Sequence, residues 1–526
     1  MDFRKLSLYK YPILFSLSCV ALYAAFAYDL DRSDFIKLIG LYGALFFLSF
    51  KLIQFQKHNY WVLVSLSLVF RLIFILALPM LSQDYFRFIW DGRLLANGFN
   101  PYEYSPAELG ADPSLRVSQA RQLIAGMGGL SAANYTNYAP VNQLVFLFAG
   151  WLAGNNILFS VILMRIVIIA ADFGTLYFGT KLLRSLPLPD HRIFWYMLNP
   201  FIIIELTGNL HFEGLMVFFL VWALYLLHKG KWIWSAIVFG FSVSVKLLPL
   251  LFLPLLFRYF SGYSSTGISK ASTGISHSNE NNPKINYPGE QPVHFKKDHS
   301  LPNRPKANES HPEENRGEAI SQPEVNREVT TSQPERSRGV ISFGRLILYY
   351  LLVFVVVSLS FFPFFNSEVL QNFTQSISLW FGKFEFNASV YYVVRWIGFQ
   401  VKGYNIIATA GKFLPLITFL LILALSFFRK NQTTRQLITG MLFAISAYLF
   451  LSTTVHPWYL TIPLILSIFT EFRYVIVWTA VVMLSYFAYS NPDFQENLWL
   501  VGLEYLVVIG YFILEISGKK RLLPSF

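Results

Sequence analysis

Apolar residues recur along the chain in runs of about 17 to 25, the length that crosses a hydrocarbon core of about 30 Å, and short polar segments separate the runs. Hydropathy predicts spans near residues 11–28, 34–55, 60–80, 155–180, 193–207, 211–228, 232–246, 247–260, 343–363, 404–428, 436–453, 457–471, 474–490 and 498–516. The pattern therefore predicts an all-α polytopic membrane protein with about 14 transmembrane helices.

The distribution of Lys and Arg beside the spans predicts the orientation, because cytoplasmic loops carry the excess of these residues. With the N-terminus in the cytoplasm, the basic positions that fall in cytoplasmic segments are Lys57, Lys181, Arg184, Arg192, Lys229, Lys231, Arg429, Lys430, Arg435, Arg473 and Lys519 to Arg521. This orientation requires the apolar stretch 141–152 to lie at the membrane interface. A crossing there would turn the basic loop 181–192 outward.

Three longer segments interrupt the spans. Residues 81–140, rich in Tyr, Asn, Pro and Gly, and the aromatic residues 364–403 are expected to form extracytoplasmic loops large enough to build a site. Residues 261–342 are rich in Ser, Asn, Pro, Glu and Lys, so they bury too little apolar surface to fold and are expected to form a disordered cytoplasmic linker. This linker separates an N-terminal membrane half, 1–260, from a C-terminal membrane half, 343–526.

Composition supports the membrane assignment, since 54% of the 526 residues are hydrophobic and 14% are charged. The formal charge of +12 does not indicate nucleic-acid binding, because Lys and Arg are scattered at the ends of spans. Cys19 is the single cysteine, which excludes an intramolecular disulfide and a thiolate metal cluster. The first run follows a basic start and contains Ala25-Phe26-Ala27, so a cleaved signal peptide is an alternative to a first span.

The densest polar cluster follows the third predicted span, between Ser82 and Arg93. If this segment begins a helix at the membrane surface, Asp84, Arg87 and Asp91 share one face at spacings of three and four. A carboxylate there can deprotonate an acceptor hydroxyl, and an arginine fork matches a phosphate leaving group. The other interpretation is a set of intrahelical ion pairs on an interfacial helix, which contribute little to stability.

The same segment carries a resemblance to a known family. It reads S-x-D-x-x-R-x-x-W-D-G-R from Ser82 to Arg93, followed by G-x-N-P-Y from Gly98 to Tyr102. This string resembles the first extracytoplasmic loop of the GT-C superfamily, especially the polyprenyl-phosphate-mannose-dependent mannosyltransferases of bacteria and their GPI-mannosyltransferase relatives. Further matches, in the expected order, are Tyr138-Ala139-Pro140, Asn199-Pro200, Gly208 to Glu213, Lys246 to Pro249, and His456 to Tyr459. The resemblance implies a GT-C-type helical bundle with extracytoplasmic catalytic loops.

The resemblance also implies roles for the two carboxylates of the cluster. In that family an acidic residue of the first loop acts as the base in an inverting single displacement, and Asp84 is the matching position. Asp91 would then be structural or a second acid. Two features depart from the family's pattern: two extra spans precede the loop, and the acidic pair expected near His211 is reduced to Glu213.

Charged residues inside apolar runs are also informative. A cation at a helix centre costs about 2.5 to 3.5 kcal/mol, and Lys246 is followed by Pro249, which breaks the helix. Lys246 is therefore expected to end a span at the outer surface and face the cavity, with snorkelling as the alternative. Arg165 and Asp172 lie seven residues apart on one predicted span, which favours internal pairing.

The remaining candidates would bind substrate. His211 and Glu213 are expected where a span emerges on the outer face, where they would orient acceptor hydroxyls or cap helix ends. Arg87, Arg93 or Lys246 would lie near the phosphate of the carrier. Three further candidates are Tyr138, Arg395 as a contact of the carrier phosphate, and His456 beside Trp458 and Tyr459.

These features predict a glycosyltransferase of the cell inner membrane that moves a hexose, expected to be mannose, from a polyprenyl-phosphate donor to a glycolipid or glycan acceptor. Its other expected partner is membrane lipid, and no nucleic acid is expected. No metal site or cofactor is predicted, since the carboxylates lack zinc-ligand spacing, and a divalent cation bridging Asp84 to a phosphate is the alternative. A flippase or transporter of lipid-linked sugars is less favoured, because transporters keep ionisable residues near the midplane and often show inverted repeats. A polysaccharide polymerase or ligase remains open.

Overall fold

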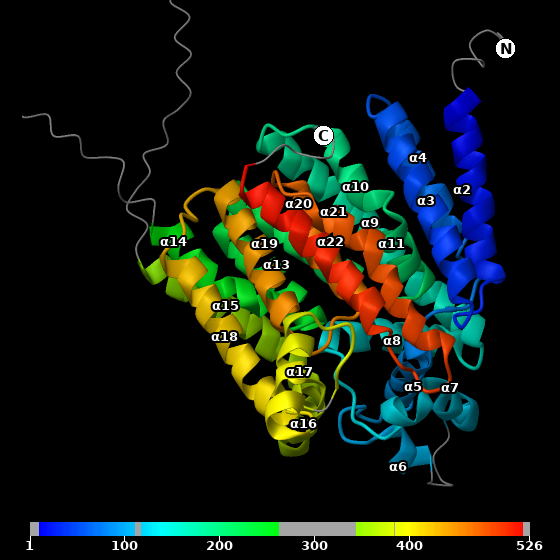
Figure 1. Ribbon diagram of the computed structural model, residues 1–526. Coiled ribbons are helices and arrows are strands. Elements are labelled where there is room, and N and C mark those ends of the chain that lie inside the picture. The colour runs from blue at the N-terminus through cyan, green and yellow to red at the C-terminus, as the bar shows by residue number, and fades with distance from the viewer. Residues whose placement is uncertain (1–9, 111–116, 262–342, 383, 519–526) are drawn as a thin grey trace, which may run out of the picture. The chain divides into compact units, whose positions relative to one another are not determined.

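The computed structural model describes residues 10–110, 117–261, 343–382 and 384–518 (Figure 1). These residues belong to one compact unit that combines the two predicted membrane halves. The predicted linker, 261–342, lies outside the described residues except for Ser261, so its expected disorder stays a prediction.

The regular secondary structure of the described residues is helical, apart from a single parallel bridge between Phe386 and Thr454. The N-terminal half contains α2 (Lys10–Tyr28), α3 (Phe35–Gln56), α4 (Tyr60–Leu72), α5 (Asp84–Ala96), α6 (Pro106–Gly110), α7 (Ala120–Ala132), α8 (Pro140–Ala153), α9 (Ile157–Ser185), η1 (Asp190–Ile193), α10 (Phe194–Met197), α11 (Pro200–Ile202), η2 (Ile203–Gly208), α12 (Glu213–His228), α13 (Trp232–Val245), η3 (Leu248–Leu255) and α14 (Leu256–Ser261). The C-terminal half contains α15 (Phe343–Phe361), η5 (Phe362–Phe364), α16 (Ser367–Gly382), α17 (Val390–Lys402), α18 (Ile407–Phe427), α19 (Thr434–Leu451), η6 (Pro457–Leu460), α20 (Thr461–Ile468), α21 (Tyr474–Val481), η7 (Val482–Ser490) and α22 (Leu498–Ile516).

Seven of the described helices are long and apolar enough to cross a membrane, which confirms the prediction of an all-α polytopic membrane protein. They are α2, α3, α9, α15 with η5, α18, α19 and α22. An eighth span would join Pro200–Gly208 to Glu213–His228, and the chain bends by 116° between these two helices. The other predicted spans are shorter apolar helices. One cause of their shortness is a proline inside the apolar run, such as Pro254 in η3. Proline removes a backbone donor and clashes with the preceding turn, so it breaks a helix that hydropathy reads as continuous.

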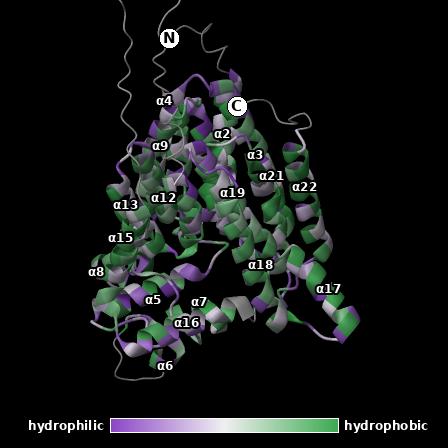
Figure 2. Cartoon of the chain, turned by 90° about the vertical axis from the view of Figure 1, so that its left-hand side faces the viewer, coloured by the Kyte–Doolittle hydropathy of each residue, from purple (hydrophilic) through white to green (hydrophobic). Residues whose placement is uncertain are grey.

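The outward faces of the long helices are apolar, as lipid contact requires. Figure 2 shows hydrophobic residues along α15, α18 and α22. Exposed side chains on these helices include Phe354, Phe419 and Leu506, with Leu506 73% exposed. A water-soluble fold would bury such residues, so their exposure agrees with a membrane environment.

Arg165 stabilises the backbone where the predicted spans are broken. Its guanidinium donates to the carbonyls of Thr207 at 2.7 Å and Gly208 at 3.1 Å, at the end of η2. It also donates to the carbonyls of Ile75 and Ala77, which follow α4. Irregular backbone at membrane depth needs such internal partners, because no water is available to satisfy its polar groups.

Asp172 does not pair with Arg165, so the expected pairing between these two residues is wrong. Asp172 instead binds Arg71 of α4, with 2.8 Å between Oδ2 and Nε, and neither side chain is exposed. Arg71 also donates to the carbonyls of Ser67 and Met197. The residues face the bundle as expected, but each finds its partner on another element.

Several basic loops gather at one end of the unit. Arg192 lies 3.5 Å from Glu471, and Arg435 pairs with the same carboxylate. His228, at the end of α12, contacts the hydroxyl of Thr434 at the start of α19. Figure 1 shows α5, α6 and α7 of the first predicted loop at the other end, together with α16 and α17 of the second.

Helices α5 and α8 approach each other more closely than side chains would allow. A Cβ atom on Gly92 of α5 would lie 2.0 Å from the carbonyl oxygen of Phe146 in α8. A Cβ atom on Gly150 of α8 would lie 2.5 Å from the carbonyl carbon of Gly92. Because the atoms in the way belong to backbone, neither helix can yield without moving as a whole. Glycine at both positions thus allows α8, the predicted interfacial helix, to pack on α5.

Replacing Gly92 with alanine is therefore expected to destabilise the protein by about 1 to 3 kcal/mol, the usual cost of overpacking. The measurement is the thermal unfolding midpoint of the purified protein in detergent. Gly43→Ala is the matched control, because a Cβ atom on Gly43 of α3 would meet no atom within 4 Å. Equal midpoints for Gly92→Ala and Gly43→Ala would contradict the close backbone contact.

Candidate active site

Asp84 is held at the first turn of α5, in the segment predicted to form the catalytic loop. Its backbone N–H donates to Ser82 Oγ at 3.2 Å. The preceding residue, Gln83, donates through Nε2 to the carbonyl of Met127 in α7 at 3.0 Å. These contacts fix where α5 begins. The partial positive charge of a helix N-terminus favours a carboxylate in the first turn.

The environment of Asp84 shifts its protonation equilibrium. The side chain keeps part of its surface accessible although protein atoms surround it closely. The pKa of Asp84 is raised to about 6, first by burial and then by the negative charge of Glu213, while Lys246 and a hydrogen bond with Tyr138 act to lower it. A carboxyl group whose pKa lies close to the working pH is well suited to act as a general base.

Lys246 lies beside this carboxylate at the end of α13, where the backbone becomes extended. Its Nζ is 2.5 Å from Glu213 Oε1 and 4.2 Å from the centre of the Tyr459 ring. Asn142 of α8 holds the same helix end by donating to the carbonyl of Val245 at 2.8 Å. The expectation that Lys246 ends a helix is confirmed, and the cation is anchored by a carboxylate and a ring.

Four aromatic rings stack on one another next to Lys246. These rings, the ring column, belong to His211, Trp458, His456 and Phe386. The centroid of Trp458 lies 3.8 Å from that of His211 and 4.5 Å from that of His456. The centroid of Phe386 lies 5.2 Å from that of His456. Both faces of Trp458 are therefore covered by imidazoles, which leaves no face for stacking on a sugar ring.

A buried carboxylate that was not predicted from the sequence lies next to the ring column. Glu205 is completely buried in η2 and accepts hydrogen bonds from the Tyr486 hydroxyl at 2.7 Å and from Asn209 at 3.2 Å. Its Oε2 lies 3.5 Å from Nε2 of His211. An acidic residue in the apolar stretch 201–206 was the available signal, since such residues are costly in a membrane and mark functional sites.

Asp91 and Arg87 lie deeper in the protein than Asp84 and bind each other. Arg87 Nε is 2.8 Å from Asp91 Oδ1, and the carboxylate also accepts from Thr136 and Gln143. Arg87 donates in addition to the carbonyls of Ser131 and Asn134. Asp91 is fully buried. Of the two roles predicted for Asp91, these contacts favour the structural one. They also connect the last turn of α7 and the segment that follows it to α5.

Two other predicted phosphate contacts also lie apart from Asp84. Arg93 is buried and donates to the carbonyl of Ser118 at 2.6 Å and to Gln119 Oε1 at 3.0 Å. Arg395 of α17 pairs with Glu385 and lies over the ring of Tyr392. The structure thus brings together Asp84, Tyr138, Glu213 and Lys246, with His211 and His456 in the adjoining ring column. Arg87, Asp91, Arg93 and Arg395 bind other partners, although the charges of Arg87 and Asp91 still act on Tyr138.

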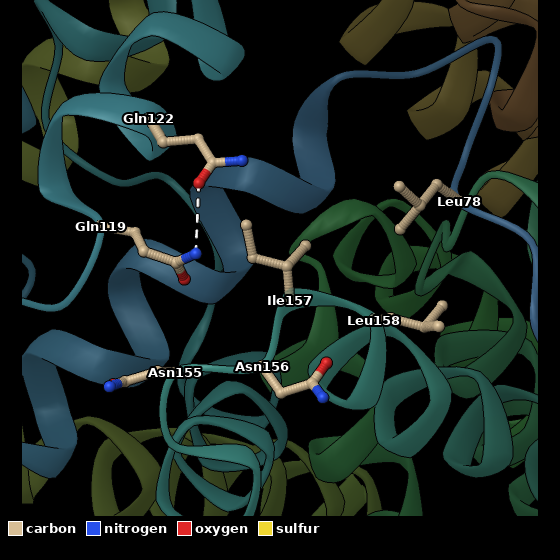
Figure 3. A pocket seen from close by; sticks show the side chains of 7 residues that line it. All are labelled: Leu78, Gln119, Gln122, Asn155, Asn156, Ile157 and Leu158. Carbon is tan, nitrogen blue, oxygen red and sulfur yellow. Dashed lines mark hydrogen bonds between the residues drawn. The ribbon is translucent and has the colours of Figure 1, made fainter.

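A shallow pocket of about 590 Å³ lies between α7 and the start of α9 (Figure 3). It is lined by Leu78, Gln119, Gln122, Asn155, Asn156, Ile157 and Leu158. Gln119 donates to Gln122 at 3.2 Å across its rim. No predicted site residue lines this pocket, and Arg93 reaches it only through Gln119.

Comparisons with known proteins bear on the first half of the chain. Two similar proteins are both named alpha-(1->6)-mannopyranosyltransferase A, one from Mycobacterium tuberculosis and one from Corynebacterium glutamicum. The first is 25% identical over 183 residues, which cover 35% of this chain and 34% of the relative. The second is 25% identical over 203 residues, which cover 38% of this chain and 39% of the relative. The chain thus matches little more than a third of the length of these relatives.

No solved structure matches the chain. Residues 38–261 match the family model described as alpha-(1->6)-mannopyranosyltransferase, N-terminal domain. This stretch includes Asp84, Tyr138, Glu213 and Lys246. The resemblance to membrane mannosyltransferases that the sequence predicts is therefore confirmed for the region 38–261, which matches the alpha-(1->6)-mannopyranosyltransferase family.

Proposed function

We propose that the protein is an integral membrane glycosyltransferase that moves a hexose, expected to be mannose, from a polyprenyl-phosphate donor to a glycolipid or glycan acceptor. The observation that carries the proposal is the partly accessible carboxylate of Asp84, with its pKa near 6, beside the Lys246–Glu213 pair. The family match over these residues supports mannose as the sugar. The names of the relatives support an alpha-(1->6) linkage in the product.

In the proposed reaction Asp84 removes the proton from an acceptor hydroxyl. The hydroxyl oxygen then attacks the anomeric carbon of the donor sugar, and the bond from that carbon to the phosphate oxygen breaks. The electron pair of this bond stays on the departing phosphate. A single displacement inverts the anomeric centre, so an alpha product would require a beta-linked donor. The cationic Nζ of Lys246 would attract the anionic donor, and the Tyr138 hydroxyl would orient Asp84.

The membrane side follows from the positive-inside rule. The end that carries Arg192, Arg435 and His228 would face the cytoplasm, which puts Asp84 on the extracytoplasmic side of the cell inner membrane. A polyprenyl-phosphate sugar is a suitable donor there, since its lipid lies in the membrane. His211, Glu213 and His456 would then contact the acceptor from the same side.

We further propose that transfer needs no resident cofactor. Among the described residues, no group of three or more His, Cys, Asp or Glu side chains is arranged to hold a metal ion. A divalent cation that bridges Asp84 to the donor phosphate would borrow ligands from the substrate. Running the assay below with and without a chelator separates these two cases.

The test is transfer of radiolabelled mannose by the purified protein in liposomes that contain a glycolipid acceptor. Label is expected in the glycolipid when polyprenyl-phosphate mannose is supplied, and not when a nucleotide-linked mannose is supplied. No transfer from any polyprenyl-phosphate sugar, together with movement of lipid-linked sugar across the liposome membrane, would contradict the proposal and favour a flippase.

The pH dependence of the rate is a second expected result. A base must be ionised, so the rate should fall about tenfold per pH unit below pH 6, where Asp84 becomes protonated. Because Lys246 lowers the pKa of Asp84, Lys246→Met should move the midpoint of this fall to higher pH. Because Glu213 raises the pKa, Glu213→Gln should move the midpoint to lower pH. A midpoint near pH 4, unmoved by either substitution, would contradict Asp84 as the base.

A further inference from the structure

We propose that Arg32, in the loop between α2 and α3, binds the phosphate group of the polyprenyl-phosphate carrier. The inference rests on the proposed function and extends it to a residue that lies before the family match of residues 38–261. Arg32 was not among the residues that the sequence singled out. Its chemistry is that of a guanidinium whose donors are free to bind a phosphate oxygen pair.

The acidic residues around Arg32 are occupied by other partners. Asp29 binds Lys37 at 2.8 Å. Asp31 accepts from the backbone N–H and the hydroxyl of the serine two residues later, at 2.8 and 2.7 Å. Asp34 caps α3 by accepting from the backbone N–H of Lys37 at 3.1 Å. In the described part of the chain, no carboxylate forms an ion pair with Arg32, although three aspartates lie within three residues of it.

Arg32 is instead held by aromatic rings from the other half of the chain. Its guanidinium carbon lies 4.4 Å from the ring centre of Tyr489 and 5.7 Å from that of Phe494. Phe494 has a φ of 52°, in the left-handed region that is unfavourable for a side chain of this size. Cation–π contact fixes the guanidinium plane while leaving N–H donors at its edge for an anion.

The position of Arg32 adjoins the candidate active site. The ring of Tyr489 lies 6.1 Å from that of Phe386, the last member of the ring column. The positive charge of Arg32 acts on Asp84 and lowers its pKa. Arg32 and Lys246 thus both act on the same carboxylate, and each rests on a tyrosine ring.

The other cations near the site are already engaged. Lys246 is paired with Glu213, and Arg395 with Glu385. Arg87 is paired with Asp91, and Arg93 donates to backbone and amide oxygens. A phosphate that binds to one of these groups must compete with an existing partner. Arg32 offers its charge without that cost.

The reaction gives this charge a role in catalysis as well as in binding. When the sugar leaves, the carrier changes from a phosphodiester with one negative charge to a phosphomonoester with two. The proton from the acceptor hydroxyl goes to Asp84, so no proton neutralises the phosphate. A cation that binds the phosphate more strongly as its charge grows stabilises the transition state more than the ground state.

The experiment compares the affinity of the purified protein for polyprenyl phosphate with its affinity for polyprenol, in nanodiscs of phosphatidylcholine. The wild-type protein is expected to prefer the phosphate, and Arg32→Gln is expected to reduce this preference about 10- to 100-fold, the usual range for a charged hydrogen bond. Arg121→Gln is the matched control, because Arg121 is an exposed arginine of α7. Tyr489→Phe should retain the preference, whereas Tyr489→Leu should weaken it several-fold by removing the supporting ring.

The outcomes separate this inference from the proposed function. A wild-type preference that survives in Arg32→Gln would overturn the role of Arg32 and leave the proposed function standing. A wild-type protein without any preference for the phosphate would overturn both. Repeating the measurement in nanodiscs of phosphatidylglycerol distinguishes the source of the phosphate. If the wild-type protein then loses its preference for polyprenyl phosphate and no longer differs from Arg32→Gln, Arg32 binds a phospholipid headgroup. In that case the assignment to the carrier is wrong.

Discussion

Replacing Asp84 with asparagine is expected to lower the rate of sugar transfer about 10²- to 10⁴-fold, the usual contribution of a positioned general base. Asparagine has nearly the same shape as aspartate, and its side-chain amide can still accept a hydrogen bond from Tyr138, so the helix end should remain in place. It cannot take up the acceptor proton. The measurement is the initial rate of label transfer from polyprenyl-phosphate mannose, normalised to the amount of folded protein.

The matched control for this substitution is Glu368→Gln, which neutralises an exposed carboxylate at the start of α16. It should leave the rate unchanged. If Asp84→Asn were as active as the wild type while Asp91→Asn remained folded and inactive, the base would be Asp91. The buried contacts of Asp91 with Arg87, Thr136 and Gln143 make the opposite result expected, namely that Asp91→Asn lowers the unfolding midpoint.

Replacing Arg71 with methionine is expected to cost about 3 to 5 kcal/mol of stability, because it leaves the fully buried carboxylate of Asp172 without its partner. The Arg71 guanidinium also satisfies the carbonyls of Ser67 and Met197, which would lose a donor. The measurement is the thermal unfolding midpoint in detergent, together with the yield of membrane-inserted protein.

Arg184→Met is the matched control for the buried pair. Arg184 binds Asp190 at 2.7 Å, but its side chain is 62% exposed. Exposed pairs contribute about 0 to 1 kcal/mol, so this substitution should change the midpoint little. The double variant Arg71→Met, Asp172→Leu should recover much of the loss, since an apolar pair of similar volume can replace a buried ion pair. A midpoint for Arg71→Met equal to that of Arg184→Met would contradict the argument.

The residues of the candidate site that the sequence could single out are those that depend on local pattern. Asp84 was identified from a motif within one short segment, and Lys246 from a cation next to a helix-breaking proline. Hydropathy could also place Glu213 near the membrane surface, since charged residues mark the ends of apolar runs. The predicted topology places Asp84, Glu213 and Lys246 at the same end of the bundle, so their proximity could be expected.

Residue partners that come from distant segments could not be predicted in this way. Arg165 and Asp172 share a helix face, so spacing favoured pairing between them, but Arg71 and the broken backbone near Gly208 supply stronger partners. Periodicity reports which face a residue occupies and contains no information about the neighbour that covers this face. The same limit explains why Arg32 was missed, because its rings lie more than 450 residues further along the chain.

The positions at which helices break were also beyond prediction from the sequence. Hydropathy averages over windows of about 19 residues, so the stretch 193–207 was predicted as one span although it consists of α10, α11 and the π-helical turn η2. Glu205 lies in such a turn, at the bend between η2 and α12. The predicted spans therefore gave correct positions for the apolar segments and too simple a geometry for the segments that form the site.

The ring column has a consequence for the order in which the protein is assembled during synthesis. His211 belongs to the segment that emerges early from the ribosome, whereas its stacking partner Trp458 and the neighbouring His456 follow roughly 240 residues later, which takes about 10 to 50 s at typical rates of translation. During that interval the bend before α12 is already inserted without the ring that covers His211. Asp84 and the four rings of the ring column can therefore come together only as a late step of biogenesis, after the C-terminal helices have entered the membrane.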